Sequence, residues 1–275
     1  LKMTKKFGII GNPIKHSLSP VLHNYWFEKY KIDAEYSIIE TEDKDLPDVV
    51  KKIKNKDLRG INITLPFKQK IVPFLDILIN DAELTSSVNT LYLDNKERII
   101  GENTDVFGLQ AAYLKEVDGA SKKRALVIGA GGVSPSAILS LQKSGVKEIS
   151  IINRTKEKCI FLKKKFKTLN ILEWTSLKKE IQNFDIIINA TSLGLKGGTD
   201  FDFDFSPVKT NLIYIDTIYN PLKTKTLKFL KEKGIKIFNG LDMFIYQGQK
   251  AFYLWNKINP EIDEKLVELL ISKLR

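Results

Sequence analysis

The architecture of this chain follows from residues 125–134, which read Ala125-Leu126-Val127-Ile128-Gly129-Ala130-Gly131-Gly132-Val133-Ser134. An apolar strand at 125–128 runs directly into a glycine-rich turn, a helical segment follows at 137–141, and a further apolar strand covers 149–152. Glycines in such a turn let backbone N–H groups approach a pyrophosphate at a helix N-terminus. We therefore predict a βαβ unit in which Gly129, Ala130, Gly131, Gly132 and Val133 hold a dinucleotide.

The position of this turn predicts a chain in two parts. Well over a hundred residues precede Gly129, enough for a separate α/β unit that binds substrate. From residue 123 onward, strand candidates alternate with helical segments, which is typical of a doubly wound parallel sheet. These strand candidates lie at Leu126, Ile149, Ile171, Ile186, Ile213 and Ile235. The predicted fold is α/β: an N-terminal α/β substrate domain plus a doubly wound Rossmann dinucleotide-binding domain.

The end of the strand at 149–152 indicates which dinucleotide binds. It continues as Asn153-Arg154-Thr155, without the acidic residue that would hold a ribose 2′-hydroxyl. An arginine here can stack on adenine and pair with a 2′-phosphate, so we predict NADP rather than NAD. The alternative is that Arg154 merely begins a solvated basic helix. The turn departs from its usual pattern at Ser134, where glycine or alanine is common.

Composition narrows the class of protein. The net charge is +11, but the lysines are dispersed and no aromatic residues interleave with them as a nucleic-acid platform would require. One cysteine excludes an internal disulfide, and two histidines make a metal centre improbable. No apolar run approaches the ~20 residues that span a bilayer. We expect a soluble cytoplasmic protein that acts on small molecules, without metal, membrane or nucleic acid.

Polar side chains follow the apolar strands of the first part, where ligands bind in α/β sheets. Ser17 and Ser19 lie in a proline-restrained loop and can aim two hydroxyls at one carboxylate, although Ser19 can equally cap the next helix. Asn62 and Thr64 alternate onto one side of a strand, and Lys68 follows them. A lysine in a partly apolar pocket can transfer a proton, whereas a lone surface lysine is the default interpretation.

A third polar group brackets a predicted hairpin around residues 94–95. Asn89 precedes its first strand, and Asp105 follows its second strand. Asp105 then begins a predicted connecting helix over 105–115. Aspartate and asparagine are favoured helix caps, so Asp105 is either the N-cap of that helix or a functional carboxylate.

Taken together, these segments resemble the shikimate dehydrogenase family, NADP-dependent reductases of 3-dehydroshikimate in aromatic amino-acid biosynthesis. Nine motifs in the family's order carry the resemblance over nearly the whole chain. They are Gly11-Asn-Pro-Ile-Lys-His-Ser-Leu-Ser-Pro20, Asn62-Ile-Thr-Leu-Pro-Phe-Lys68, Val88-Asn-Thr90, Asn103-Thr-Asp105, Gly129-Ala-Gly-Gly132, Asn153-Arg-Thr155, Asn189-Ala-Thr-Ser192, Asp216-Thr-Ile-Tyr-Asn-Pro221 and Gly240-Leu-Asp-Met-Phe-Ile-Tyr-Gln247. Ser86-Ser87 departs from the Gly-Ala that usually precedes the third motif.

The resemblance implies a role for each site residue. Lys68 is implied as the catalytic acid or base, paired with Asp105. Ser17 and Ser19 are implied to hold the substrate carboxylate. The ring hydroxyls are implied to contact Thr64, Asn89, Asp105 and Gln247, with Asn62 and Tyr219 nearby. The pyrophosphate is implied at the Gly129 turn, the 2′-phosphate at Asn153, Arg154 and Thr155, and the rest of the cofactor at Thr191, Thr217, Gly240 and Met243, the last three on the nicotinamide side.

The same resemblance implies a discontinuous substrate domain. We expect residues 1–105 to form it, the C-terminal helices at 242–275 to complete it, and residues 106–241 to form the NADP-binding Rossmann domain. A monomer or a homodimer is expected. The alternatives are a quinate/shikimate dehydrogenase of broader specificity, a folate-linked methylene dehydrogenase and a basic binding protein without enzymatic activity.

Overall fold

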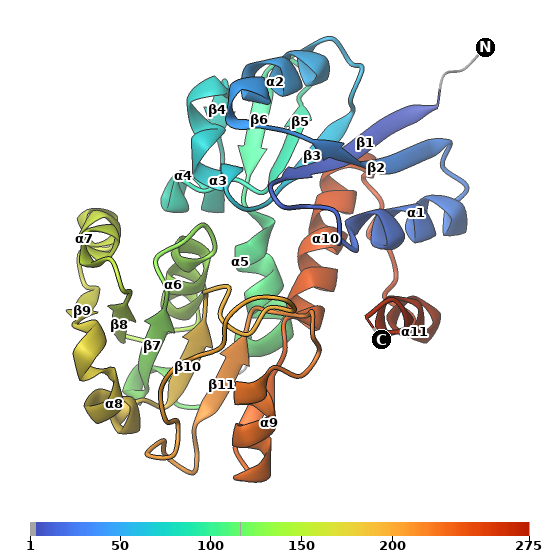
Figure 1. Cartoon of the computed structure of the whole chain (residues 1–275). Coiled ribbons are helices and arrows are strands. Elements are labelled where there is room, and N and C mark those ends of the chain that lie inside the picture. The colour runs from blue at the N-terminus through green and yellow to red at the C-terminus, as the bar shows by residue number, and fades with distance from the viewer. Residues whose placement is uncertain (1–3, 116, 275) are drawn as a thin grey trace. The chain divides into compact units, whose positions relative to one another are not determined.

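A computed structural model describes residues 4–115 and 117–274 of the chain. The chain divides into two compact units (Figure 1). The first comprises the residues up to Phe107 together with those from Ile245 onward, and the second runs from Gly108 to Phe244. In the described part of the chain, 4–115 and 117–274, no helix combines the length and apolarity needed to cross a bilayer.

The first unit is built on a six-stranded mixed sheet with the order β2-β1-β3-β5-β6-β4. β1 pairs in parallel with β2 and β3, whereas β5 runs antiparallel to β3 and β6. The strands are β1 (Lys5–Gly11), β2 (Ala34–Glu40), β3 (Gly60–Ile63), β4 (Ile77–Leu78), β5 (Thr90–Leu93) and β6 (Ile99–Glu102). The antiparallel pairing of β5 with β6 confirms the predicted hairpin.

Helices lie on both faces of this sheet. The helices of the unit are α1 (Ser19–Lys29), α2 (Leu46–Lys54), α3 (Phe67–Lys70), α4 (Asp81–Thr85), α5 (Thr104–Leu109), α10 (Leu241–Asn256) and α11 (Glu264–Ser272). Of these, α11 packs on α1. On one face α2 buries Val49 and Ile53 against Ile61 of β3. On the other, α1 and α10 meet through the rings of Trp26 and Phe252, whose centroids are 5.5 Å apart.

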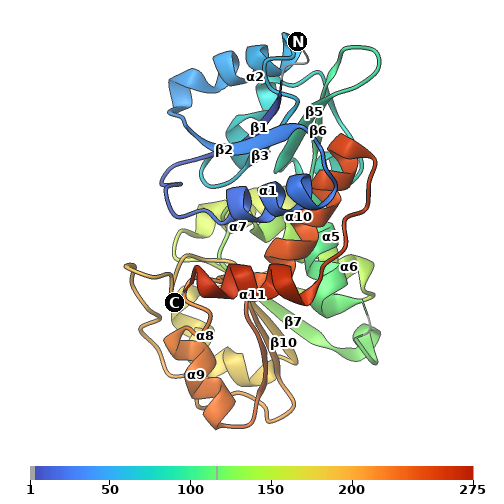
Figure 2. The same ribbon diagram turned by 90° about the vertical axis from the view of Figure 1, so that its right-hand side faces the viewer.

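Residues at the two ends of the chain therefore share one core. The Trp26 indole donates to the Glu261 carbonyl at 3.0 Å, and the Trp255 indole donates to the Leu91 carbonyl at 3.1 Å. Lys29 at the end of α1 pairs with Asp263 at 2.5 Å, the residue that caps α11. Figure 2 shows α1 and α11 side by side.

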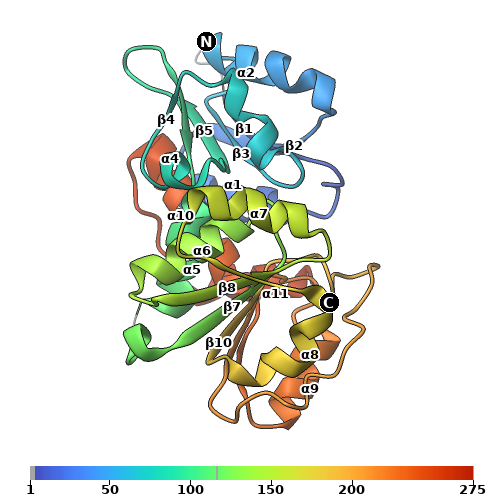
Figure 3. The same ribbon diagram turned by 90° about the vertical axis from the view of Figure 1, so that its left-hand side faces the viewer.

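The second unit is a parallel six-stranded sheet with the order β12-β11-β10-β7-β8-β9. Figure 3 labels its central strands β8, β7 and β10. The strands are β7 (Arg124–Ile128), β8 (Glu148–Ile152), β9 (Asn170–Leu172), β10 (Ile186–Asn189), β11 (Ile213–Asp216) and β12 (Lys236–Phe238). Chain order reverses between β7 and β10, as in a doubly wound sheet. The predicted fold class is confirmed.

The helices of this unit are α6 (Ser134–Lys143), α7 (Lys156–Lys165), α8 (Leu177–Glu180) and α9 (Lys225–Glu232). Leu177 of α8 and Leu230 of α9 pack on one face of the sheet with Leu126 of β7. α6 packs against β7, and α7 packs against β8 and β9. The loop at 201–205 adds a buried ring, Phe205, edge-on to Tyr214 at 5.7 Å.

One predicted helix differs from the structure observed. The helix expected over 105–115 is α5 followed by a π-helical turn, Gln110–Leu114, in which the Lys115 N–H reaches the Gln110 carbonyl at 2.9 Å. The short helix α4 ends at Thr85, because Ser86 adopts a left-handed conformation with φ of 49°. Glycine occupies that conformation with less strain, which explains why serine at this position is unusual.

Candidate active site

An ion pair between Lys68 and Asp105 is the centre of the polar cluster in the first unit. Lys68 lies on α3 and Asp105 in the first turn of α5, and Lys68 Nζ is 2.5 Å from Asp105 Oδ2. The side chains are 12% and 6% exposed, so the pair is largely shielded from water. A shielded ammonium held in one place is the arrangement that proton transfer requires.

Asp105 is not the cap of its helix. The Asn103 side chain accepts the Asp105 N–H at 3.1 Å, and α5 begins at Thr104. The capping interpretation of Asp105 is therefore wrong. Because asparagine two residues earlier takes this role, both oxygens of Asp105 face side chains of the cluster: Oδ2 faces Lys68 and Oδ1 accepts from Asn89 at 3.0 Å.

Asn89 connects the ion pair to the C-terminal part of the chain. Its Nδ2 lies 3.0 Å from Asp105 Oδ1, 3.2 Å from Gln247 Oε1 on α10, and 2.8 Å from Thr104 Oγ1. Its Oδ1 accepts the Thr104 N–H at 2.7 Å. The structure thus brings together Lys68, Asn89, Asp105 and Gln247, all predicted from sequence motifs.

Asn62 lies beneath this cluster and is nearly buried, at 4% exposure. Its Nδ2 donates to the Asn89 carbonyl at 3.0 Å and to Thr90 Oγ1 at 3.1 Å, while its Oδ1 accepts from the Tyr36 hydroxyl at 2.8 Å. Both ends of the amide are therefore engaged within the protein. Asn62 supports the backbone that carries Asn89.

Ser17, Ser19 and Thr64 follow β1 and β3, two parallel neighbours whose carboxyl ends meet. The Thr64 N–H donates to the Ile10 carbonyl at 3.0 Å, and the Asn12 N–H donates to the Leu65 carbonyl at 2.9 Å, which joins the two loops. Ser17 Oγ accepts the Ser19 N–H at 3.2 Å and keeps its own proton to donate. Because α1 begins at Ser19 with no side-chain cap, the interpretation of Ser19 as a cap is wrong.

The glycine-rich turn is the corresponding feature of the second unit. Gly129 has φ of 108°, and a Cβ there would lie 2.7 Å from Thr191 Cγ2, so no side chain fits. A Cβ on Gly131 would meet nothing within 4 Å, which leaves its backbone open to a ligand. The Ala130 N–H is held by Asn153 Oδ1 at 3.2 Å. The turn fits a pyrophosphate.

Arg154 and Thr155 follow β8 and are exposed, while Asn153 braces them by donating to the Thr155 carbonyl at 2.9 Å. Arg154 forms no ion pair within residues 4–115 and 117–274, so its guanidinium is available to a phosphate.

Ser134, the departure from the usual turn, is fully buried and its hydroxyl has no partner among the described residues. The packing of α6 accommodates the extra oxygen.

Thr191 and Thr217 are held by Asn189 at the end of β10, a residue to which the sequence motifs assigned no role. Its Oδ1 accepts from Thr191 Oγ1 at 2.7 Å, and its carbonyl accepts from Thr217 Oγ1 at 2.8 Å. Asn189 in turn donates to the buried Asp216 at 3.0 Å. Burial raises the pKa of Asp216 to about 6. The signal that could have found both is a polar residue ending each apolar strand.

Gly240 and Met243 lie beside the end of β11. A Cβ on Gly240 would lie 2.2 Å from the Thr217 carbonyl oxygen, and the Gly240 N–H donates to the Ile218 carbonyl at 2.8 Å. Tyr219, which continues this segment, packs on Phe244 with ring centroids 4.7 Å apart. Only glycine permits this approach of two backbone segments.

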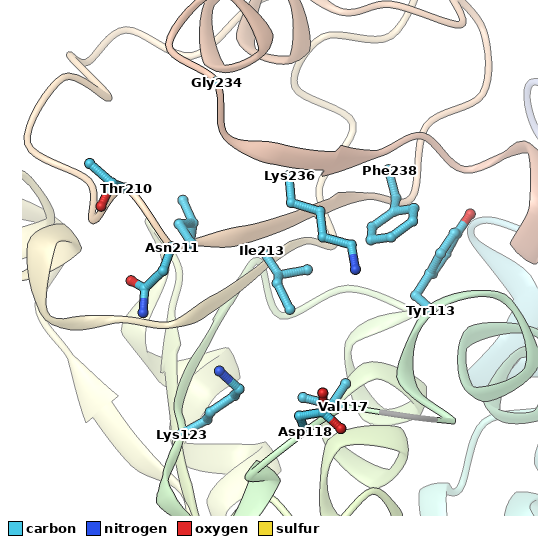
Figure 4. A pocket seen from close by; sticks show the side chains of 11 residues that line it. Tyr113, Val117, Asp118, Lys123, Thr210, Asn211, Ile213, Gly234, Lys236 and Phe238 are labelled. Atoms are coloured by element: carbon cyan, nitrogen blue, oxygen red, sulfur yellow. The ribbon is translucent and has the colours of Figure 1, made fainter.

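A cavity of about 370 Å³ also occurs in the second unit, but at the other end of its sheet (Figure 4). Its lining includes Lys123, Ile213 and Lys236, which lie at the amino ends of β7, β11 and β12. The glycine turn and Thr217 lie at the carboxyl ends. The cavity is therefore separate from the predicted cofactor residues.

Comparisons with known proteins agree with the motifs. Residues 9–91 match the family model for the shikimate dehydrogenase substrate binding domain, and residues 112–195 match that for shikimate / quinate 5-dehydrogenase. A relative from Pelagibacter ubique, shikimate dehydrogenase (NADP(+)), is 46% identical over 98% of this chain and 99% of its own. The chain belongs to the shikimate dehydrogenase family.

Solved structures of the family have the same fold. Shikimate dehydrogenase from Aquifex aeolicus is 36% identical with a TM-score of 0.87, covering 99% of this chain and 98% of its own. Shikimate 5-dehydrogenase from Thermus thermophilus, in complex with NADP(H) and shikimate, is 29% identical with a TM-score of 0.87, covering 98% and 100%. The resemblance inferred from the sequence is confirmed.

Proposed function

We propose that this chain is an oxidoreductase that catalyses the reversible, NADPH-dependent reduction of 3-dehydroshikimate to shikimate in chorismate and aromatic amino-acid biosynthesis. The observation that carries this proposal is the shielded Lys68–Asp105 pair, which Asn89 joins to Gln247. An ammonium, a carboxylate and two amides in one cluster match a substrate that exposes several hydroxyls beside a reacting carbonyl.

Each unit has its own part in this proposal. The first unit, approximately residues 1–105 completed by 242–275, is the substrate domain. The second, approximately residues 106–241, is the NADP-binding Rossmann domain. The division of the chain at Phe107 and Ile245 supports this assignment, since it groups Gln247 with Lys68 and Asn89.

Lys68 is the acid that protonates the substrate oxygen during reduction and the base that accepts the proton during oxidation. Asp105 orients the ammonium, and Asn89 and Gln247, with Thr64, hold the ring hydroxyls. Ser17 and Ser19 donate to the substrate carboxylate, with Asn62 and Tyr219 as neighbours. When bound, NADPH supplies the hydride.

NADP binds through the glycine turn, Gly129–Val133, and its 2′-phosphate through Asn153, Arg154 and Thr155. Two observations support the fit: the open backbone at Gly131 and the exposed, unpaired guanidinium of Arg154 within the described residues. An arginine offers the bidentate donors that a phosphate monoester accepts. Thr191, Thr217, Gly240 and Met243 complete the cofactor site.

The experiment that tests this function is oxidation of shikimate by the purified protein, followed through the reduced nicotinamide that forms. Parallel assays use NADP⁺ or NAD⁺ and shikimate or quinate. We expect turnover of shikimate with NADP⁺, and a much smaller rate with NAD⁺. Comparable turnover of quinate would favour the broader quinate/shikimate enzyme, and no turnover of either would overturn the proposal.

We also propose that the enzyme works in the cytoplasm on small molecules, as a monomer or homodimer, without nucleic acid or membrane. A single cysteine and an NADPH-dependent reaction fit a reducing compartment. Light scattering of the purified protein would measure its mass directly. A larger assembly, or retention on nucleic acid at physiological salt, would contradict this part of the proposal.

A further inference from the structure

The hydroxyl of Tyr113 forms hydrogen bonds with residues that precede and follow Gly240 in the sequence. The phenol donates to the Asn239 carbonyl and accepts the Met243 N–H at 3.1 Å. Tyr113 lies 126 residues from Asn239 in the sequence and outside every motif that predicted the site. One side-chain oxygen therefore joins the segment that enters the second unit to the segment that leaves it.

These contacts complete the N-terminus of α10. The first N–H groups of a helix have no partner within the helix and need one from elsewhere. Asn239 Oδ1 accepts the Leu241 N–H at 3.0 Å, and Tyr113 accepts that of Met243, the third residue of the helix. Asn239 itself is held by donating to the Leu222 carbonyl at 3.1 Å.

The position of Tyr113 is fixed on the ring side as well. Its ring packs on Phe238, with centroids 5.1 Å apart, and Figure 4 shows the two rings side by side. The residue lies in the π-helical turn Gln110–Leu114, and such turns are frequent at functional sites. Burial raises the pKa of Tyr113 well above its usual range, so the phenol keeps its proton and remains a donor.

We propose that Tyr113 is a positioning residue that sets the segment 239–243 for the nicotinamide end of the cofactor. Gly240 lies against the Thr217 carbonyl, and the Tyr113 hydroxyl bonds to Asn239, which precedes Gly240, and to Met243, three residues after it. The placement of Met243 and Gly240 then depends on a residue outside the set assigned to the substrate and the cofactor. This inference rests on the proposed assignment of Gly240 and Met243 to the cofactor site.

The test is Tyr113→Phe, which keeps the ring on Phe238 and removes only the hydroxyl. Tyr214→Phe is the matched control, because the Tyr214 hydroxyl is fully buried in the same unit and has no partner among the described residues. The readouts are the Kd for NADP⁺ by calorimetry, the KM for NADPH and for 3-dehydroshikimate, and the Tm.

We expect Tyr113→Phe to weaken the binding of NADP⁺ and to raise the KM for NADPH, each by about tenfold. The KM for 3-dehydroshikimate should stay within about twofold of wild type. Tyr214→Phe should leave the Kd and both KM values unchanged. A lowered Tm with unchanged cofactor affinity would make Tyr113 merely structural and overturn the inference while the proposed function stands. Wild-type protein that fails to bind NADP⁺ would overturn both.

Discussion

The two polar clusters of this protein are built in different ways. In the first unit, side chains hold side chains: Lys68, Asp105, Asn89 and Gln247 meet through ammonium, carboxylate and amide groups. In the second unit the backbone forms the site, and Gly129 and Gly240 allow main-chain groups to approach within distances that no Cβ would tolerate. Chemistry on a small substrate needs placed functional groups, whereas a pyrophosphate needs placed N–H groups.

This difference determines how each unit should respond to mutation. Truncation of a side chain in the first cluster removes a chemical group but leaves the backbone in place. Addition of a side chain at Gly129 or Gly240 in the second cluster displaces the backbone itself. The first unit is therefore expected to lose catalysis with little loss of stability, whereas substitution of either of these two glycines should lower stability and cofactor binding together.

The largest expected effect is that of Lys68→Ala. Because a positioned acid acts mainly in the transition state, kcat should fall by about 10²–10⁴ while substrate KM changes far less. Lys70→Ala is the control, since Lys70 lies on the same helix but is half-exposed and pairs with Asp43 at 2.5 Å. Near-normal kcat with a greatly raised KM would instead make Lys68 a substrate clamp.

His23 in the first unit and Asp216 in the second are both buried, and their contributions to the free energy of unfolding should change with pH in opposite directions. Burial lowers the pKa of His23 in the first unit from 6.5 to about 3, so the stability it contributes is present above pH 6.5 and is lost as pH falls toward 3. Burial raises the pKa of Asp216 in the second unit from 3.8 to about 6, so its contribution is present below pH 3.8 and is lost as pH rises through 6.

The test is to measure the free energy of unfolding in urea between about pH 4 and pH 7.5 for the wild type, His23→Phe and Asp216→Asn. The difference between the wild type and each variant shows the direction of that residue's pH dependence. Relative to wild type, the His23 variant should become more stable as pH falls, by about 3 kcal/mol between pH 7.5 and pH 4. The Asp216 variant should become relatively more stable as pH rises to 6. Parallel curves for wild type and either variant would show that the residue does not titrate as its burial implies.

Arg154→Ala tests the charged side chain among the three residues to which the 2′-phosphate is assigned. Loss of the charged pairing with a 2′-phosphate should cost about 1.5–3 kcal/mol of NADP⁺ binding and leave NAD⁺ nearly unaffected. Lys158→Ala, on the exposed surface of α7, is the control. Equal losses for both dinucleotides would indicate that Arg154 supports the adenine or the fold and not the phosphate.

Two glycine substitutions separate backbone packing from ligand access. Gly240→Ala should lower the free energy of unfolding by about 1–3 kcal/mol, because its Cβ would overlap the Thr217 carbonyl oxygen. Gly131→Ala should leave the free energy of unfolding nearly unchanged, since its Cβ meets nothing within 4 Å, yet it should weaken the binding of NADP⁺. The comparison fails if Gly240→Ala unfolds at the same denaturant concentration as wild type.

The smallest expected effect is at Ser134. Its buried hydroxyl has no partner among the described residues, so Ser134→Ala should raise the free energy of unfolding by about 1 kcal/mol. Ser140, also buried on α6, donates to the Ser136 carbonyl at 2.7 Å, so Ser140→Ala should bring no such gain. Equal changes in the two variants would mean that the unpaired hydroxyl is not costly.

Much of the site could be predicted from sequence because its residues end apolar strands. Gly129 follows β7, Arg154 follows β8, and Thr64 follows β3, and ligands bind where parallel strands end. The choice between NADP and NAD could likewise be read from residues 153–155 alone. Local pattern suffices here because strand periodicity and turn chemistry are set by neighbours in the chain.

Local pattern could not decide the role of Asp105 or find Tyr113. Asp105 faces Lys68 because Asn103 accepts its N–H at the start of α5 and leaves the carboxylate free for other contacts. The contact also requires α3 to bring Lys68, which is 37 residues away in the sequence, next to Asp105. Gln247 reaches Asn89 across 158 residues. Sequence by itself determined which residue types end each strand, while the tertiary structure decided which of them meet, because contacts between distant residues depend on how the helices pack on the sheets.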